Sequence, residues 1–247
     1  MTGAVTAAPL RDLISGPSVR VDVLGGGPRA LYLRHPGGRL MALLAPDAVA
    51  LPLGVVLDEP CPPRPGPVRV GAGRVTFPGA EVVVHGWFAT AIGAVRPAAG
   101  AREWCVRQAA DLDEARTGLT AAQRDALRGF DADATATTLC GTGPGLTPAG
   151  DDALCAVLVA AAAGLVRLPP GWVERVLTHA TRATTDLSVQ LLHLAADGHV
   201  AAPVRRLFRA LEQPARLSAA WADVRAMGHT SGAAFAFGLG AVLAWPQ

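Results

Sequence analysis

Short apolar runs separated by glycine and proline fill the N-terminal third of the chain. Runs of this length between turn residues are typical of strands. We expect strands at residues 19–24, 30–34, 40–44, 68–70, 74–77 and 81–84. The pattern therefore predicts an antiparallel β-rich domain, a meander or a small barrel, over residues 1–101.

Beyond residue 102 the apolar positions recur at helical spacing. Residues 104–117 are amphipathic, and the stretch from Thr120 to Gln123 has the form of a capping box that begins another helix. Further helices are expected at residues 149–166, 170–183, 185–196, 202–211, 219–227 and 230–244. The chain is therefore predicted to be an α+β protein in which an α-helical bundle, residues 102–247, follows the β-rich domain.

Two segments rich in glycine or proline interrupt the N-terminal third. Gly25, Gly26 and Gly27 resemble a phosphate-binding loop, but residues 30–34 predict a strand where such a loop needs a helix. A hairpin turn explains these glycines better, because glycine adopts positive φ without steric cost. Residues 60–67 are rich in proline and predict a stiff connector between strands.

The composition narrows the functional classes. The chain has 247 residues, of which 51% are hydrophobic, so it can bury a sizeable core. The net charge of +2, with Arg and acidic residues evenly mixed, argues against binding to nucleic acid or to a membrane surface. All 22 basic residues are Arg. A Schiff-base mechanism and a Walker-type phosphate loop both need Lys, so both are excluded.

Cysteines, histidines and apolar runs carry little functional signal. Four cysteines are spread over the chain: Cys61, Cys105, Cys140 and Cys155. They have no metal-binding spacing and are interpreted as reduced core residues, with a catalytic thiol at Cys140 as the alternative. The histidines lack zinc-site spacing, so no metal site is proposed for them.

The apolar runs at residues 153–166 and 230–245 are shorter than the ~20 residues that cross a bilayer. No signal-peptide pattern is seen, so we expect a cytoplasmic protein.

Residues 141–152 have the sequence Gly-Thr-Gly-Pro-Gly-Leu-Thr-Pro-Ala-Gly-Asp-Asp, which is unlike the rest of the chain. Alternate glycines at Gly141, Gly143 and Gly145 let the backbone turn tightly and let a ligand approach its N–H groups. Helix starts attract anions, so we expect a phosphate, a carboxylate or an enolate-like oxygen to bind above Gly143 and Gly145.

The second half of this segment predicts the start of a helix. Thr147 has the chemistry of an N-cap, and Pro148 suits the first helical position. Gly150 is a candidate substrate contact. Asp151 and Asp152 fall in the first turn, where they either cap the helix dipole or act as a metal ligand, a general base or an amide acceptor. Because consecutive helical residues lie about 100° apart, only one of the two can point directly into a pocket.

A second polar cluster lies near residue 185. Thr185 and Ser188 are three residues apart and share a helix face, so their hydroxyls are candidates to contact one ligand. Capping of the following helix by Thr184 or Thr185 is the simpler explanation. Arg182, just before this cluster, is the first candidate for an anion-binding cation.

A third polar cluster precedes the last apolar run. His229, Thr230, Ser231 and Gly232 place a titratable imidazole and two hydroxyls at another expected helix start, a suitable place to hold a carboxylate or a leaving group. A helix cap with an incidental histidine is the alternative. Three such helix starts can converge on one point, and we expect them to form a common pocket.

The segment at residues 141–152, followed in order by the Thr185 and Ser188 segment and by residues 228–232, resembles the oxamate carbamoyltransferase subunit family of anaerobic allantoin breakdown. The resemblance covers residue 138 to the C-terminus, while the β-rich third matches only in general character. It implies carbamoyl transfer between carbamoyl phosphate and a small amide acid, running from oxalurate towards carbamoyl phosphate, as part of purine catabolism. It also implies companion subunits or a homo-oligomer.

The residue chemistry suggests how such a site would work. Phosphate or carbamoyl phosphate would bind the N–H groups of Gly143 and Gly145 together with Thr147. Asp151 or Asp152 would orient or deprotonate the amide nitrogen, so replacing Asp151 by Asn should abolish turnover. His229, Thr230 and Ser231 would hold the second substrate.

Two other functions fit the same residues. One is a non-catalytic regulatory subunit that binds a small carboxylate or a nucleotide through these loops. The other is a magnesium-dependent hydrolase that uses Asp151 and Asp152 as metal ligands, and Mg²⁺ is the one cofactor considered. Ligand binding without turnover would favour the first, and metal-dependent thermal stabilisation would favour the second.

Overall fold

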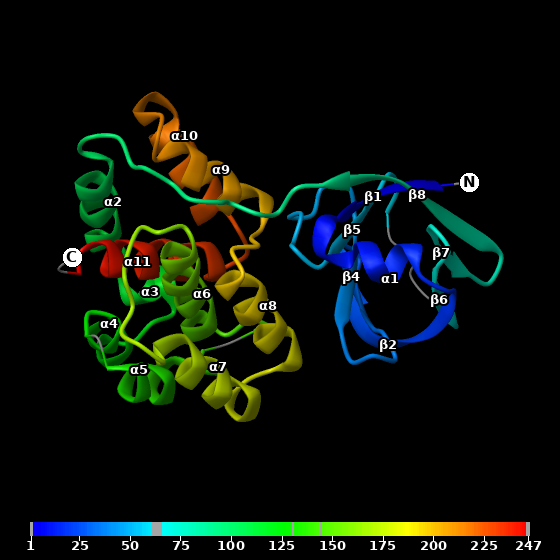
Figure 1. Ribbon diagram of the computed structural model, residues 1–247, viewed down its shortest axis with the longest axis horizontal. Helices are drawn as coiled ribbons and strands as arrows, with labels where there is room; N and C mark the ends of the chain where they lie inside the picture. The colour runs from blue at the N-terminus through cyan, green and yellow to red at the C-terminus, as the bar shows by residue number, and fades with distance from the viewer. Residues whose placement is uncertain (1, 61–65, 130, 144, 246–247) are drawn as a thin grey trace. The chain divides into compact units, whose positions relative to one another are not determined.

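A computed structural model describes residues 2–60, 66–129, 131–143 and 145–245 of the chain (Figure 1). The chain divides into two compact units, Met1–Thr90 and Ala91–Gln247. The first unit holds the strands and the second holds all helices after α1, which confirms the predicted α+β class.

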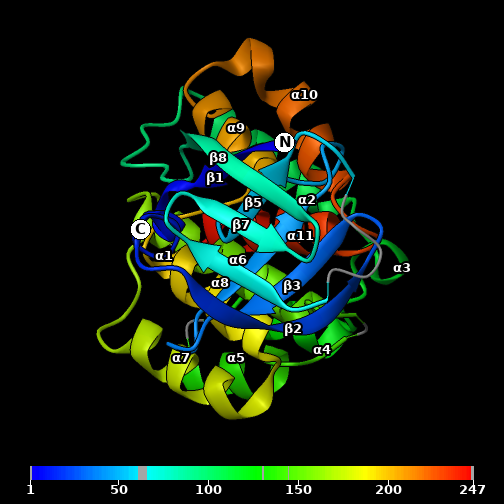
Figure 2. The same cartoon turned by 90° about the vertical axis from the view of Figure 1, so that its right-hand side faces the viewer.

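Within the described residues, the first unit is a closed barrel of eight strands (Figure 2). The strands are β1 (Thr2–Ala7), β2 (Val19–Gly27), β3 (Ala30–Arg34), β4 (Leu40–Leu44), β5 (Gly54–Leu57), β6 (Val68–Gly71), β7 (Arg74–Phe77) and β8 (Ala80–Phe88). Two short helical segments, η1 (Ala8–Leu10) and α1 (Arg11–Ser15), connect β1 to β2. Around the barrel the order is β1-β5-β4-β3-β2-β6-β7-β8, and β8 pairs with β1.

The barrel is mixed. Two of its strand pairs, β1 with β8 and β4 with β5, are parallel, and the other pairs are antiparallel. One of the two predicted forms, a small barrel, is therefore present, but it is not wholly antiparallel as predicted, and β1 and β5 were not predicted. The reason is physical: Thr2 pairs with Val82 at the far end of the unit, so local sequence gives no signal for this contact. Closure by β1 leaves the sheet without an open edge.

The glycines at residues 25–27 lie in strand β2, not at the turn. Gly25, Gly26 and Gly27 pair with residues of β3 across a bulge that follows Val23. The hairpin is confirmed, but its turn falls at residues 28–29. In the predicted stiff connector, residues 61–65 lie outside the described part of the chain.

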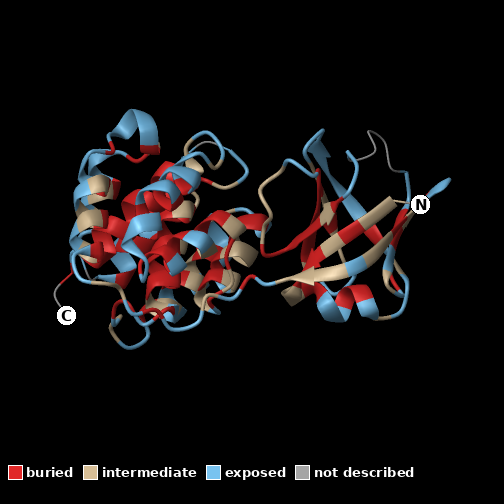
Figure 3. Cartoon of the chain, turned by 90° about the horizontal axis from the view of Figure 1, so that it is seen from above, coloured by how far each residue is buried: buried red, intermediate tan, exposed pale blue. Residues whose placement is uncertain are grey.

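The barrel has its own apolar core. Leu33, Met41, Leu43, Val55 and Val75 have no exposed surface. Figure 3 shows the buried stretches of the barrel strands in red. Apolar side chains that leave water in this way supply the main stabilisation of such a unit. The second half of β2, by contrast, is exposed from Asp22 onwards.

The second unit contains the helices that carry the candidate site (Figure 1). They are α2 (Ala101–Ala110), α3 (Glu114–Thr117), α4 (Ala121–Ala126), α5 (Ala132–Leu139), α6 (Ala149–Ala162), α7 (Trp172–Ala183), α8 (Asp186–Ala196), α9 (Ala202–Ala210), α10 (Pro214–Arg225) and α11 (Ser231–Leu243). The capping box at Thr120 and Gln123 is confirmed. No described helix is both long and apolar enough to cross a membrane.

Three helix predictions need correction. The expected helix at 104–117 is two helices, because α2 ends at Ala110 and the Asp113 side chain caps α3 by accepting the Arg116 N–H. Helix α5 was not predicted, although Asp131 caps it. Helix α10 begins at Pro214, five residues before the expected start at 219, because Pro is well tolerated in a first helical turn.

Helix α11 is buried along nearly its whole length and packs mainly against α6 and α2. Its glycines make this possible. A Cβ atom at Gly238 would lie 2.5 Å from the Ala153 carbonyl oxygen of α6, and one at Gly240 would lie 2.1 Å from the Ala109 Cβ of α2. Close packing of this glycine-containing helix is therefore confirmed, and it fixes the start of α11 beside the start of α6.

Candidate functional site

The loop before α6 requires its glycines. Gly141, Gly143 and Gly145 have φ values of 71°, 112° and 100°, a region that other residues rarely adopt. Two of them are also crowded, since a Cβ at Gly141 would lie 1.9 Å from the Ala183 carbonyl oxygen and one at Gly143 would lie 2.8 Å from the Ala149 nitrogen. The glycine pattern thus lets the loop pass directly against its neighbours.

Helix α6 begins at Ala149 as expected, but its predicted cap at Thr147 is wrong. Pro148 is the N-cap and Thr147 makes no capping bond, because its hydroxyl lies 3.3 Å from the Ser231 hydroxyl of α11. The Gly150 N–H donates to the Thr142 carbonyl, while the N–H groups of Asp151 and Asp152 donate to Pro148. These three donors of the first turn are therefore already used within the protein.

A second layer of polar residues supports this loop and was missed in the sequence. The Gln123 amide donates to the Thr142 hydroxyl at 2.7 Å, and that hydroxyl donates to the Leu139 carbonyl at 2.6 Å. A Cβ at Gly150 would lie 2.0 Å from the same Leu139 oxygen, so Gly150 is a close-packing position. The capping box pointed to Gln123, but nothing in its local sequence indicates the contact with Thr142.

Gly141, Asp151, Thr184 and Ser188 form what we term the Asp151 cluster. Asp151 is 2% exposed. Its Oδ1 accepts the Gly141 N–H at 2.8 Å, and its Oδ2 accepts the Thr184 hydroxyl at 2.5 Å. The Ser188 hydroxyl lies close enough to favour the charged carboxylate, although its oxygen completes no hydrogen bond among the described residues. Asp151 thereby ties the glycine loop to the junction between α7 and α8.

Thr147, Asp152 and Ser231 form the Asp152 cluster. Asp152 is partly buried, and its Oδ2 atom is buried with no hydrogen-bond partner among the described residues. The hydroxyls of Ser231 and Thr147 lie near enough to its carboxyl group to favour the charged form. The cluster joins the loop, the first turn of α6 and the first residue of α11.

The two carboxyl groups differ in what their surroundings do to them. Burial raises the pKa of Asp152 to about 7, the Ser231 and Thr147 hydroxyls oppose this shift, and the charge of Asp151 adds to it. Burial also raises the pKa of Asp151, but the hydrogen bonds from Thr184 and Gly141 and the Ser188 hydroxyl oppose the shift. Among the described residues, neither carboxylate forms an ion pair with Arg or His.

The structure therefore brings together the three predicted segments, but not every predicted residue. Thr185 is the N-cap of α8, as the simpler explanation held, and its hydroxyl also donates to the Leu146 carbonyl. His229 and Arg182 are exposed, and in the described part of the chain neither bonds to either cluster. Thr230 precedes Ser231 and makes no capping bond.

Gly232 has a packing role in the first turn of α11. A Cβ there would lie 1.9 Å from the Val224 carbonyl oxygen, so α10 approaches α11 closely at this point. A role for Gly232 in substrate binding remains a prediction.

The neighbouring thiols do not suit nucleophilic catalysis. Burial, with a smaller effect of the Asp151 charge, raises the pKa of the Cys140 thiol to about 12. Burial and the charges of Asp152 and Asp151 raise the pKa of the Cys155 thiol well above its ordinary value. The thiolate is the reactive form, so both cysteines are unreactive at neutral pH and the alternative of a catalytic Cys140 is disfavoured.

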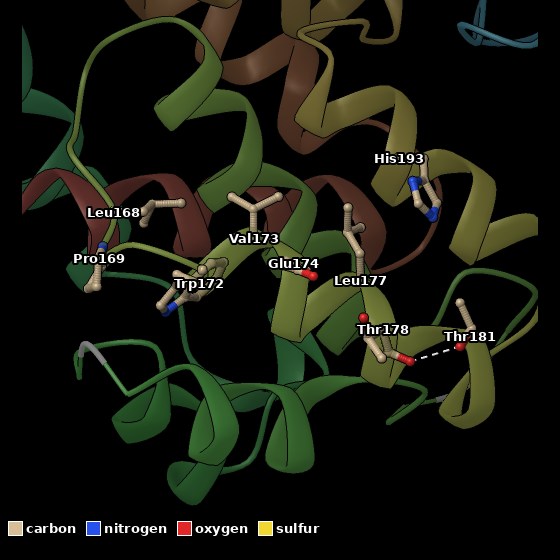
Figure 4. Close-up of a pocket in the computed structure, with 10 residues that line it drawn as sticks. Leu168, Pro169, Trp172, Val173, Glu174, Leu177, Thr178, Thr181 and His193 are labelled. Atoms are coloured by element: carbon tan, nitrogen blue, oxygen red, sulfur yellow. Dashed lines mark hydrogen bonds between the residues drawn. The ribbon is translucent and has the colours of Figure 1, made fainter.

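A pocket of about 650 Å³ lies along α7 (Figure 4). Trp172, Val173 and Leu177 give it an apolar wall, and Thr178 and His193 lie towards its other end. It includes no residue of either cluster.

The site combines two adjacent carboxyl groups of α6 with hydroxyls from α8 and α11. A loop whose three glycines have positive φ leads into it. Residues 139–243 match the oxamate carbamoyltransferase subunit AllH family. The match runs from the last residue of α5 to the last residue of α11, so it contains the loop and both clusters except their outer support at Gln123. It confirms the resemblance seen in the sequence. No solved structure significantly matches the chain.

Proposed function

We propose that the chain is a subunit of a carbamoyltransferase that moves a carbamoyl group between phosphate and a small amide acid of the oxamate class. The AllH match supports the reaction class. The family implies the reaction: oxalurate and phosphate on one side, and oxamate and carbamoyl phosphate on the other. A subunit family also supports companion subunits as partners.

The observation that carries the proposal is the state of Asp152. Its Oδ2 atom is buried and has no hydrogen-bond partner within the part of the chain that the structure describes, and two hydroxyls flank the carboxyl group. Buried polar atoms in proteins almost always have partners, so an unpartnered one in this position suits a substrate contact. A carboxyl group with a pKa near 7 is populated in both its acid and base forms at neutral pH, as general acid–base catalysis needs.

The chemistry assigned to Asp152 is proton transfer at the amide nitrogen. In the direction of carbamoyl phosphate formation, a phosphate oxygen attacks the ureido carbonyl of oxalurate and the bond to the oxamate nitrogen breaks. Protonated Asp152 gives its proton to that leaving nitrogen, and the attacking phosphate returns one proton to the carboxylate. In the reverse direction, Asp152 accepts the proton from the attacking amide.

Asp151 is assigned a positioning role. Both of its oxygens accept hydrogen bonds from the protein, so it holds the loop and the α7–α8 junction in place for Asp152. The same bonds argue against the magnesium-dependent hydrolase, which would need Asp151 as a metal ligand beside Asp152. Arg182 and His229 remain candidates for binding the charged ends of the substrates.

The test is the carbamoyl-transfer activity of the chain purified together with its native partners. We expect wild type to form carbamoyl phosphate from oxalurate and phosphate. Asp152→Asn should lower kcat by about 10²- to 10⁴-fold, because general acid–base catalysis contributes about that much. Asp133→Asn is the matched control, since Asp133 is an exposed first-turn residue of α5, and it should keep full activity. Absence of transfer in the wild-type complex, or full activity of Asp152→Asn, contradicts the proposal.

A further inference from the structure

Among the described residues, the Asp152 cluster contains one buried carboxylate oxygen, Oδ2 of Asp152 in α6, that has no hydrogen-bond partner. The buried Ser188 hydroxyl of α8, by contrast, lies against the Asp151 carboxylate. An unpartnered buried carboxylate oxygen indicates a group that completes its hydrogen bonds.

The charges around this oxygen select the kind of group. Asp151 and Asp152 raise the energy of any anion nearby, and the charge of Asp151 already disfavours the ionised form of Asp152. Among the described residues, no cation forms an ion pair with either carboxylate.

Four backbone N–H groups at this helix start are also occupied. The N–H groups of Gly150, Asp151 and Asp152 donate to carbonyl oxygens, and that of Gly141 donates to Asp151. A phosphate over the first turn of α6 would therefore meet two carboxyl groups and find these four donors already used.

A neutral amide meets none of these objections. Its N–H groups can donate to the Asp152 carboxylate, and its carbonyl oxygen can accept from a hydroxyl. We propose that the Asp152 cluster is the amide-binding subsite, that it holds the N–H groups of a neutral carboxamide, and that phosphate binds outside this cluster. The inference rests on the proposed function and assigns one half of its substrates to this site.

Oxamate and oxalate form a matched pair of probes, because they differ by an amide in place of one carboxylate. Isothermal titration of the full chain at pH 8 should show oxamate binding at least about tenfold more tightly than oxalate, since a hydrogen bond to a charged group contributes about that factor. Asp152→Asn should reduce the preference to within about threefold, because its amide can donate to a carboxylate as well as accept from an amide.

Inorganic phosphate is the third probe. Its affinity should be the same within about twofold in wild type and in Asp152→Asn, and it should not compete with oxamate. Ser231→Ala provides a second variant, which should weaken oxamate and leave phosphate binding unchanged. Circular dichroism of both variants checks that they are folded.

Several outcomes would overturn the inference. One is competition between phosphate and oxamate with tighter phosphate binding in Asp152→Asn. Another is equal affinity of wild type for oxalate and oxamate. A third is no oxamate binding, which would mean that only water completes the hydrogen bonds of the Asp152 oxygen.

The inference and the proposed function can fail separately. A preference for the amide without carbamoyl transfer would reject the proposed function alone. Carbamoyl transfer that depends on Asp152, without a preference for the amide, would reject this inference alone.

Discussion

Two neighbouring aspartates at the start of α6, one in each polar cluster, differ in how many of their carboxylate oxygens accept hydrogen bonds. In the Asp151 cluster both carboxylate oxygens accept bonds from the protein, whereas in the Asp152 cluster one buried oxygen has no partner in the described part of the chain. Consecutive helical residues lie about 100° apart, so the two side chains meet different segments. The difference indicates that the first aspartate holds the structure and the second is available to a ligand.

This division explains why both aspartates are needed at one helix start. Asp151 connects Gly141 to Thr184, residues that are far apart in sequence, and so fixes the loop that leads into the helix. Asp152 then lies between the loop and α11, and one of its oxygens has no hydrogen-bond partner among the described residues.

The largest effect is expected on removing the carboxylate of the Asp151 cluster. Asp151→Ala leaves the Gly141 N–H and the Thr184 hydroxyl without an acceptor, and each unpaired buried donor costs about 1–3 kcal/mol. We expect the free energy of unfolding to fall by about 2–5 kcal/mol in urea denaturation.

The matched control for that variant is Asp133→Ala. Asp133 also lies in a first helical turn, but its side chain is 81% exposed, so the loss should stay below about 0.5 kcal/mol. Equal losses for the two variants would show that Asp151 only interacts with the helix dipole.

A gain in stability is expected on neutralising Asp152. Since its pKa is raised from 3.8 to about 7, the folded state binds a proton that the unfolded state has lost, and wild-type stability falls as pH rises from about 4 to about 7. Asp152→Asn should therefore raise the free energy of unfolding at pH 8 by about 1–3 kcal/mol, with a smaller gain at pH 5. Thermal melting at the two pH values measures this, and a gain that does not depend on pH would contradict the raised pKa.

The smallest effect is expected for Thr185, which borders the Asp151 cluster without joining it. Thr185→Ala removes the N-cap of α8 and the bond to the Leu146 carbonyl, so stability should fall by about 1 kcal/mol in urea denaturation. Oxamate affinity should not change. A loss of oxamate binding would instead assign the Thr185 hydroxyl to the ligand site.

Local chemistry was enough to predict part of this architecture from the sequence. The capping box at Thr120, the helix after Pro148 and the positive φ angles of the glycine loop all follow from residues a few positions apart. The Thr147 cap was wrong because the Ser231 hydroxyl, 84 residues away, lies beside the same oxygen. Tertiary contact thus overrode a local preference.

The division of roles between the aspartates could not be predicted. The helix geometry showed that only one of them can face a pocket, but which one depends on Thr184, 33 residues from Asp151. The same limit applies to strand β1, whose parallel partner β8 lies at the other end of its unit. Convergence of the three helix starts was an expectation from their similar chemistry, and the structure brings two of the later segments to α6 through Ser188 and Ser231.

The most direct test of this account is an NMR titration of the Asp152 carboxyl carbon in protein labelled with ¹³C-aspartate and assigned with Asp152→Asn. We predict a midpoint near pH 7 that moves to lower pH when oxamate is added, because an N–H donor stabilises the carboxylate. A midpoint near the ordinary value of about 4 that oxamate does not change would contradict the account.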